Sequence, residues 1–110
     1  MARTSEIRFT VTLDENQVPE RIAWQAEDGA VQSTCKSALI SVWDEQENNA
    51  LRIDLWTKEM TTDEMKSFFH RHLLSMADTF ERATGETDMA RHMRAFGRYF
   101  GEEMLGIEPV

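Results

Sequence analysis

The side chains that could bind a transition metal are three histidines, His70, His72 and His92. His70 and His72 stand two positions apart in a stretch of helical periodicity, so their side chains diverge and cannot meet one metal ion as an i, i+4 pair would. His92 belongs to a second helical stretch. We therefore expect no metal site, and we interpret His72 and His92 as histidines at the rim of an apolar core.

Common catalytic motifs are absent from the sequence, which has no Ser–His–Asp arrangement, no G-x-S-x-G turn, no Walker loop and no G-x-G-x-x-G. Cys35 is the only cysteine, which excludes an internal disulfide, a paired-cysteine zinc site and a C-x-x-C redox motif. We expect no catalytic residues and no cofactor. An enzyme or a small-ligand-binding domain stays as an alternative, because a sequence does not show whether a pocket exists.

Three arginines, Arg91, Arg94 and Arg98, recur at i, i+3 and i+7 and form a basic stripe in an acidic protein. Asp88 precedes Arg91 by three positions and Glu102 follows Arg98 by four, so local ion pairs are available on a helix. We interpret the stripe as a solvated, salt-bridged helix face. The alternative is a docking strip for an acidic partner.

An aromatic group in the middle of the chain is the candidate partner-binding site: Leu39, Trp43, Arg52 and Trp56. Tryptophan is enriched in interface hot spots, and large apolar patches on soluble domains usually mark interfaces. The alternative is internal core, since a loop over 27–36 could cover the group and Arg52 could stack on Trp43. Both interpretations stay open at this point.

Alternating apolar residues place this group in a sheet. The pattern predicts strands over 6–13 and 20–26, a loop over 27–36, and a second strand pair. In that pair we expect Val42 opposite Ile53 and Ile40 opposite Leu55, with a four-residue loop over 46–49. The same register sends one set to the opposite face: Leu39, Ser41, Trp43, Arg52, Asp54 and Trp56. It also places Trp43 across from Arg52 and Leu39 across from Trp56.

After Lys58 the apolar period changes to that of a helix. Thr61 and Glu64 form a capping-box pattern at the start of a first helix, and Gly85 is placed to end it. A second helix is predicted over about 87–105, in which Gly97 and Gly101 indicate close helix packing. Its apolar stripe comprises Met89, His92, Met93, Phe96, Phe100 and Met104. That of the first helix comprises Met65, Phe68, Phe69, His72, Leu73, Met76, Phe80 and Ala83.

The order of elements predicts an α+β fold: a four-stranded antiparallel sheet of two hairpins, followed by two α-helices packed on one face. We expect a single domain over residues 1–110, with strands at about 5–58 and helices at about 61–105. Its net charge of −8, from 12 basic and 20 acidic residues, repels phosphate backbones and anionic lipid surfaces. With no apolar leader or membrane-length apolar run, we expect a cytoplasmic protein that binds no nucleic acid and does not insert into membranes.

The chain resembles the GldC family of gliding-motility proteins from end to end. The resemblance rests on SEIRFTV (5–11), DEN (14–16), VPE (18–20) and Trp24, then on SVWD (41–44), LRIDLWTK (51–58) with Met60, and MADTFERATG (76–85). It implies a cytoplasmic accessory of gliding motility, a surface-adhesin movement coupled to a secretion machine in the cell envelope. It supplies neither catalytic residues nor a cofactor.

The resemblance leaves the molecular activity open. Our main hypothesis is an accessory that binds protein partners of the gliding and secretion apparatus, or a second copy of itself as a homodimer, through the sheet face with Leu39, Trp43 and Trp56. An alternative is an export chaperone, because the expected acidic fold of four strands and two helices is similar in architecture to SecB. Architecture alone is weak evidence for function.

Overall fold

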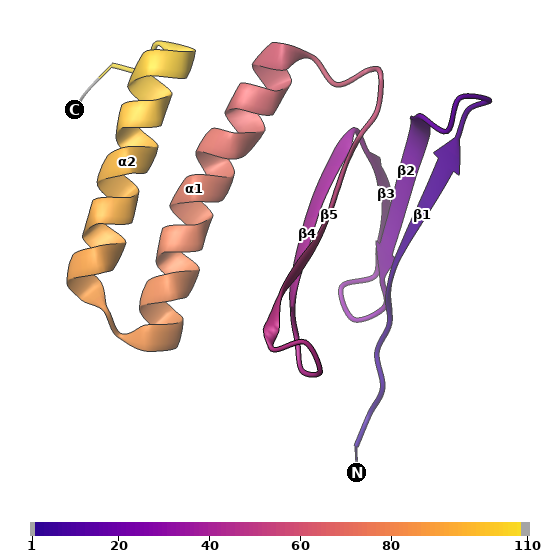
Figure 1. Cartoon of the computed structure of the whole chain (residues 1–110), viewed down its shortest axis with the longest axis horizontal. Helices are drawn as coiled ribbons and strands as arrows, with labels where there is room; N and C mark the ends of the chain where they lie inside the picture. Colours follow the sequence, from indigo (N-terminus) through magenta and orange to yellow (C-terminus); the bar gives the residue numbers. More distant parts are fainter. Residues whose placement is uncertain (1, 109–110) are drawn as a thin grey trace. The chain divides into compact units, whose positions relative to one another are not determined.

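Five β-strands precede two α-helices along the chain (Figure 1). This computed structural model describes residues 2–108. Its elements are β1 (Ile7–Leu13), β2 (Pro19–Ala26), β3 (Val31–Cys35), β4 (Ser37–Asp44), β5 (Asn49–Trp56), α1 (Thr62–Thr84) and α2 (Thr87–Leu105). Two compact units divide the chain, Met1–Met60 with all five strands and Thr61–Val110 with both helices. The α+β class is confirmed, while helices packed on one face of a sheet, and a single domain, stay predictions.

The hairpin of β1 and β2 forms as predicted. It is antiparallel, with Phe9 opposite Trp24, and these two rings stack with centroids 6.4 Å apart. Asp14 organises the turn, because its carboxylate accepts hydrogen bonds from the backbone N–H groups of Asn16 and Val18 at 2.8 and 3.0 Å. An aspartate that binds the backbone two residues ahead is typical of such turns.

The prediction of a loop over 27–36 is wrong for most of that stretch. Val31 to Cys35 form β3, which pairs antiparallel with β2. The turn between β2 and β3 contains Asp28 and Gly29, a dipeptide that favours tight hairpins, and Ala30 adopts a left-handed φ of 49°. The strand was missed because its alternation is weak: only its two end residues are apolar.

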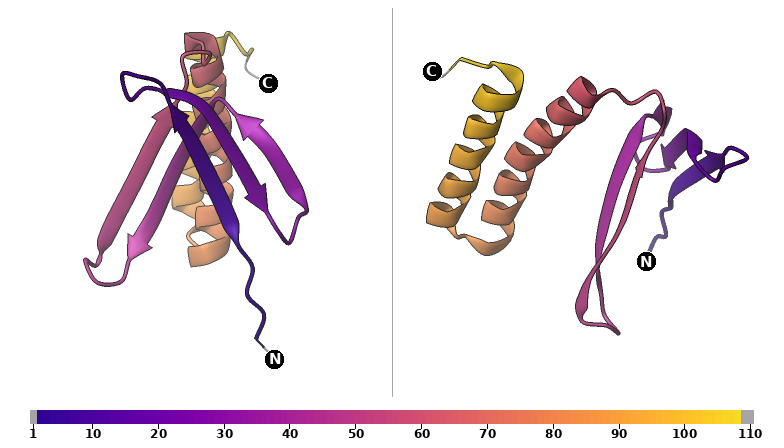
Figure 2. Two further views of the ribbon diagram at one scale, coloured as in Figure 1. Left: turned by 90° about the vertical axis from the view of Figure 1, so that its right-hand side faces the viewer. Right: turned by 45° about the horizontal axis from the view of Figure 1, so that its top comes forward.

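A bend at Lys36 separates β3 from β4, and the predicted four-stranded sheet of two hairpins is therefore wrong. The strands form a three-stranded sheet, β1-β2-β3, and a two-stranded ribbon, β4-β5. The two sheets lie in separate layers and their strands cross (Figure 2). The backbone N–H of Thr57 donates to the carbonyl of Lys36 at 2.8 Å, which continues the pairing of β5 up to the bend. A bent strand that passes between two sheets makes a corner.

The β4–β5 ribbon is a hairpin as predicted, but its register is not. Val42 lies opposite Leu51 instead of Ile53, and Ile40 lies opposite Ile53 instead of Leu55. The two strands are thus displaced by two residues from the expected pairing. A displacement of two preserves the face of every side chain, because side chains alternate with a period of two.

The turn of the ribbon explains the displacement. Asp44 pairs with Asn49, so the loop covers 45–48 instead of 46–49. The Asp44 carboxylate accepts a hydrogen bond from the N–H of Glu47 at 2.7 Å, and Asn48 adopts a left-handed φ of 50°. Aspartate and asparagine tolerate these turn geometries, and together they close the loop one residue earlier than expected.

Both helices begin and end as the sequence predicts. The Thr61 hydroxyl accepts a hydrogen bond from the Glu64 N–H at 3.0 Å, and the Glu64 carboxylate accepts one from the Thr61 N–H at 3.1 Å, which completes the capping box. Gly85 ends α1 with a φ of 73° and donates its N–H to Glu81. Residues without a Cβ adopt this left-handed cap at no steric cost.

Small residues bring α1 and α2 together along a seam. A Cβ on Gly97 would lie 2.7 Å from Leu74, and one on Gly101 would lie 2.7 Å from the His70 ring. The seam therefore comprises His70, Leu74, Ala77 and Glu81 on α1 and Ala90, Arg94, Gly97 and Gly101 on α2. The prediction that Gly97 and Gly101 mark close helix packing is confirmed.

Apart from Leu74, most of the large apolar side chains of the two helices lie beside the seam and not in it. They occupy positions one residue before the seam positions: Phe69, Leu73, Met76 and Phe80 on α1 and Met89, Met93, Phe96 and Phe100 on α2. The helices run antiparallel, and the offset from the seam is the same on each helix. The two apolar stripes therefore face the same side of the hairpin. The helical unit thus has one apolar side.

Few apolar side chains are buried in the part of the chain that the structure describes. Ile22 and Ala38 in the first unit and Ala77 and Ala90 in the second are the buried apolar residues there. Thr57 is buried as well, and its hydroxyl has no hydrogen-bond partner among the described residues. Both units therefore present many large apolar side chains to their surroundings.

Candidate functional site

The β4–β5 ribbon carries the predicted site residues on one of its two faces. Residues opposite each other across an antiparallel pair share a face, as do residues two apart along a strand. The register therefore defines a tryptophan face made of Ser37, Leu39, Ser41, Trp43, Ala50, Arg52, Asp54 and Trp56. The predicted membership of this face is confirmed, and its role in binding stays a prediction.

The two tryptophans stand at opposite ends of the tryptophan face. Trp43 lies opposite Ala50 near the turn, and Trp56 lies opposite Ser37 at the other end. Six residues of strand separate their rows, a distance of about 20 Å. Both side chains are well exposed, at 67% for Trp43 and 56% for Trp56. They form two separate anchors instead of one aromatic cluster.

An ion pair occupies the middle of the tryptophan face. Arg52 donates from Nη2 to the Oδ1 of Asp54 at 2.9 Å and from Nε to Oδ2 at 3.4 Å. The predicted cross-strand neighbours are wrong, because Arg52 faces Ser41 and not Trp43, and Leu39 faces Asp54 and not Trp56. Sequence reasoning placed Asp54 on this face but did not count it as a site residue. Its position two residues from Arg52 was the available signal.

The other side of the ribbon is almost entirely aliphatic. This aliphatic face consists of Ala38, Ile40, Val42, Asp44, Asn49, Leu51, Ile53 and Leu55. Val42, Leu51 and Ile53 are each about half exposed. A two-stranded hairpin is marginally stable alone, so the ribbon depends on packing beyond its own two strands.

The basic stripe of α2 divides between two roles. Arg91 pairs with Asp88 at 2.8 Å on the helix surface, as predicted. Arg94 instead crosses the seam and binds Asp78 at 2.8 Å and Glu81 at 2.7 Å on α1. The hydrogen bonds that Arg94 donates to Glu81 and then to Asp78 raise its pKa further above the usual value. This arginine fastens the helical unit, so the stripe does not present three equivalent cations.

The histidines lie apart, and residues 2–108 hold no group of three His, Cys, Asp or Glu side chains placed to bind a metal. His70 packs its ring against Gly101 in the seam. His72 is half-buried and lies 6.4 Å from Phe68, which fits the predicted rim of an apolar region. His92 is exposed, so its placement at a core rim is wrong for the helical unit.

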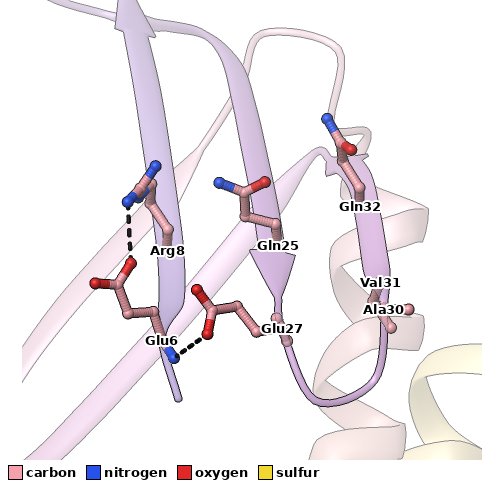
Figure 3. Close-up of a pocket in the computed structure, with 8 residues that line it drawn as sticks. Glu6, Arg8, Gln25, Glu27, Ala30, Val31 and Gln32 are labelled. Atoms are coloured by element: carbon pink, nitrogen blue, oxygen red, sulfur yellow. Dashed lines mark hydrogen bonds and ion pairs between the residues drawn. The ribbon is translucent and has the colours of Figure 1, made fainter. Parts of the chain in front are cut away.

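A depression of about 280 Å³, lined by both polar and apolar groups, lies beside the turn between β2 and β3 (Figure 3). Arg8 donates to the Glu6 carboxylate at 3.0 Å, and the Glu27 carboxylate accepts from the Glu6 N–H at 3.3 Å. Gln25 and Gln32 face each other across the strands. In Figure 3 Arg8 pairs with Glu6 and the Glu27 carboxylate binds a backbone N–H, and the residues drawn include no nucleophile with an adjacent base.

A second tie links the end of β5 to the turn after β1. Lys58 donates from Nζ to the second oxygen of the Asp14 carboxylate, whose side chain is only 10% exposed. The hydrogen bond from Lys58, followed by that from Val18, lowers the pKa of Asp14 below its usual value, and Asp14 in turn raises the pKa of Lys58. Nearby, partial burial raises the pKa of the Cys35 thiol, which keeps it protonated and weakly nucleophilic.

These features define an α+β protein with two exposed tryptophans on one face of its β4–β5 ribbon. Neither α1 nor α2, the two helices that the structure describes, has the length and apolarity to cross a membrane. Residues 19–105 match the GldC-like family, described as gliding motility-associated protein GldC-like. The chain belongs to this family, which confirms the resemblance. No curated protein and no solved structure gave a significant match.

Proposed function

We propose that the chain is a non-catalytic accessory of gliding motility that works in the cytoplasm by binding proteins through the tryptophan face. The family membership supports the process. The observation that carries the binding role is the exposure of Trp43 and Trp56 on a ribbon that, among the described residues, pairs with no third strand. Exposed tryptophans around a central ion pair are typical of interface anchors and their polar surroundings.

Capture from a gliding bacterium tests this proposal. The tagged chain is cross-linked in its native host, purified and compared with the Trp43→Ala/Trp56→Ala variant. Tyr99→Ala is a matched control, because Tyr99 is an aromatic residue of α2 with 56% exposure, equal to that of Trp56. We expect components of the motility or adhesin-secretion machinery to be enriched by the wild type and by Tyr99→Ala, and to be lost from the double variant.

Two outcomes would contradict the proposal. Capture of the same motility proteins by the double tryptophan variant would remove the tryptophan face as the binding surface. Capture of no motility or secretion component by the wild type would remove the accessory role itself. Circular dichroism of each variant separates a lost interface from a lost fold.

An export chaperone is the second candidate, favoured by the number of large apolar side chains exposed in both units. Such surfaces bind unfolded chains with little sequence preference. In this case the captured set would consist of varied secretory precursors, and the protein would suppress aggregation of an unfolded client. Failure to protect a client at stoichiometric excess would exclude it.

A further inference from the structure

The tryptophan face has an internal order that points to one partner. From one end to the other its four rows are Ser37 with Trp56, Leu39 with Asp54, Ser41 with Arg52, and Trp43 with Ala50. On each strand, two rows that lie equally far from the middle of the ribbon hold one large and one small apolar or hydroxyl residue. These pairs are Trp43 with Ser37 and Leu39 with Ser41 on β4, and Trp56 with Ala50 on β5. Each charge likewise has the opposite charge in the neighbouring row of its own strand.

This order matches a two-fold axis that crosses the strands at the middle of the ribbon. In a two-fold contact residue i meets residue j and j meets i. Rotation about such an axis brings Trp56 over Ala50 of a second copy, and Trp43 over Ser37 of that copy. It also brings Leu39 over Ser41. Every large apolar side chain of the face therefore meets a small residue, which is the condition for close packing.

The charges obey the same symmetry. The rotation places Arg52 over Asp54 of the second copy and Asp54 over its Arg52. Within one chain the two groups are already paired at 2.9 Å, with side-chain exposures of 46% and 43%. In the two-fold contact they become four charges of alternating sign, so none is buried without a partner of opposite sign.

We propose that the tryptophan face binds the same face of a second copy, with the two ribbons antiparallel, to form a homodimer. The inference rests on the proposed function, since it names the partner of that same protein-binding face. It is independent of which motility component the dimer then serves.

Other arrangements of the ribbon satisfy fewer of these conditions. Rotation about an axis along the strands would place Asp54 over Leu39, which leaves a carboxylate against an aliphatic side chain at a desolvation cost. A contact between two aliphatic faces about the axis that crosses the strands would place Asp44 over Ala38 and Ile53 over Leu51. The first pair sets a charged residue against an apolar one, and the second sets two large residues against each other. The antiparallel contact of tryptophan faces pairs both size and charge.

The expected affinity is modest. Each strand of the ribbon has eight residues and spans about 26 Å, so the ribbon contact alone belongs to the small interfaces. We therefore expect dissociation in the micromolar range. Sedimentation velocity of the wild-type chain from low micromolar to near-millimolar concentration should show a reversible monomer–dimer equilibrium.

Charge reversal gives a test with a built-in rescue. Arg52→Asp places like charges opposite each other at both symmetric positions, and so does Asp54→Arg, so each should raise the dimer Kd by about tenfold or more. The combined variant Arg52→Asp/Asp54→Arg restores opposite charges and should return the Kd to near the wild-type value. A mixture of the two single variants should form heterodimers, because each then faces its complement.

Arg8→Asp is the matched control, because Arg8 pairs with Glu6 two residues away on the exposed surface of the first sheet and the net charge changes as in Arg52→Asp. It should leave the Kd unchanged. Thermal melting of every variant confirms that it is folded. A wild type that stays monomeric throughout, unaltered dimerisation of both single variants, or failure of the combined variant to recover would each overturn the homodimer.

These outcomes are separate from those that test the proposed function. If the wild type is monomeric while the tryptophan variant loses its captured motility proteins, the homodimer is wrong and the proposed function stands. If dimerisation follows the charge pattern while no motility protein is captured, the homodimer stands and the accessory role fails.

Discussion

The α1–α2 hairpin and the β4–β5 ribbon are both antiparallel pairs, yet they use small and charged residues differently. In the helical hairpin Gly97 and Gly101 let the two helices touch, and Arg94 joins carboxylates of the opposite helix. In the ribbon the corresponding residue types, Ala50 and Arg52, lie on an open face. Small and charged residues complete a contact inside the chain in one region and are available for a contact outside it in the other.

The largest effect is expected from closing the gap that Gly97 leaves in the helical seam. Gly97→Leu would push a side chain into Leu74, since even the first added carbon, the Cβ, would lie only 2.7 Å from the Leu74 Cδ2. The variant should destabilise the fold by about 3 kcal/mol. Chemical denaturation measures the loss. Ala95→Leu, at an exposed position of α2, is the control and should be nearly neutral. Equal stability of the two variants would show that the helices do not pack through Gly97.

A gain of stability is expected at the corner between the sheets. Thr57 is 4% exposed and its hydroxyl makes no hydrogen bond within the described chain, so Thr57→Val should stabilise the fold by about 1 kcal/mol by removing an unsatisfied group. Denaturant midpoints of the two proteins test this. Destabilisation by the valine would indicate that the hydroxyl is satisfied in solution.

The tie between Asp14 and Lys58 should make stability depend on acidity. The folded chain lowers the pKa of Asp14 below 3.8, so its contribution is present above about pH 4 and is lost as the pH falls through the lowered value. Asp14→Asn should melt at a lower temperature than the wild type at neutral pH, and the difference should shrink in strong acid. Melting curves across the acidic range measure it, and a difference independent of pH would contradict the tie.

The smallest effect on stability is expected from the tryptophan face itself. Trp43→Ala and Trp56→Ala remove exposed side chains, so each should change the free energy of unfolding of the monomer by about 0.5 kcal/mol or less. Unfolding at low protein concentration isolates the monomer. A loss of several kcal/mol would mean that the tryptophans are core, and the contrast between ribbon and helical hairpin would disappear.

The sequence predicted those features of the two regions that depend on local patterns. Both ends of α1 follow from local signals: the capping box of Thr61 and Glu64 at its start and Gly85 at its end. Membership of the tryptophan face follows from alternation, which a displacement of two residues does not alter. Register did not follow, because it depends on how Asp44 and Asn48 fold the turn, and hydrophobic pattern does not report that.

The number of sheets also depended on a feature with a weak sequence signal. β3 has polar residues at its three central positions, so its strand character comes from pairing with β2 and not from its own alternation. The seam of the helices was predicted only through its glycines. The pattern of large apolar residues does not indicate Ala90 and Arg94, which form the seam one position further along the helix.

The corner at Lys36 has a mechanical consequence. A single residue joins β3 to β4, so only one pair of soft backbone dihedral angles lies between two hydrogen-bonded sheets. The bond from Thr57 to Lys36 and the tie from Lys58 to Asp14 bridge the same end of the ribbon. The ribbon is thus held firmly at this end. A force applied to the turn at its other end would be transmitted to the three-stranded sheet with little intervening motion.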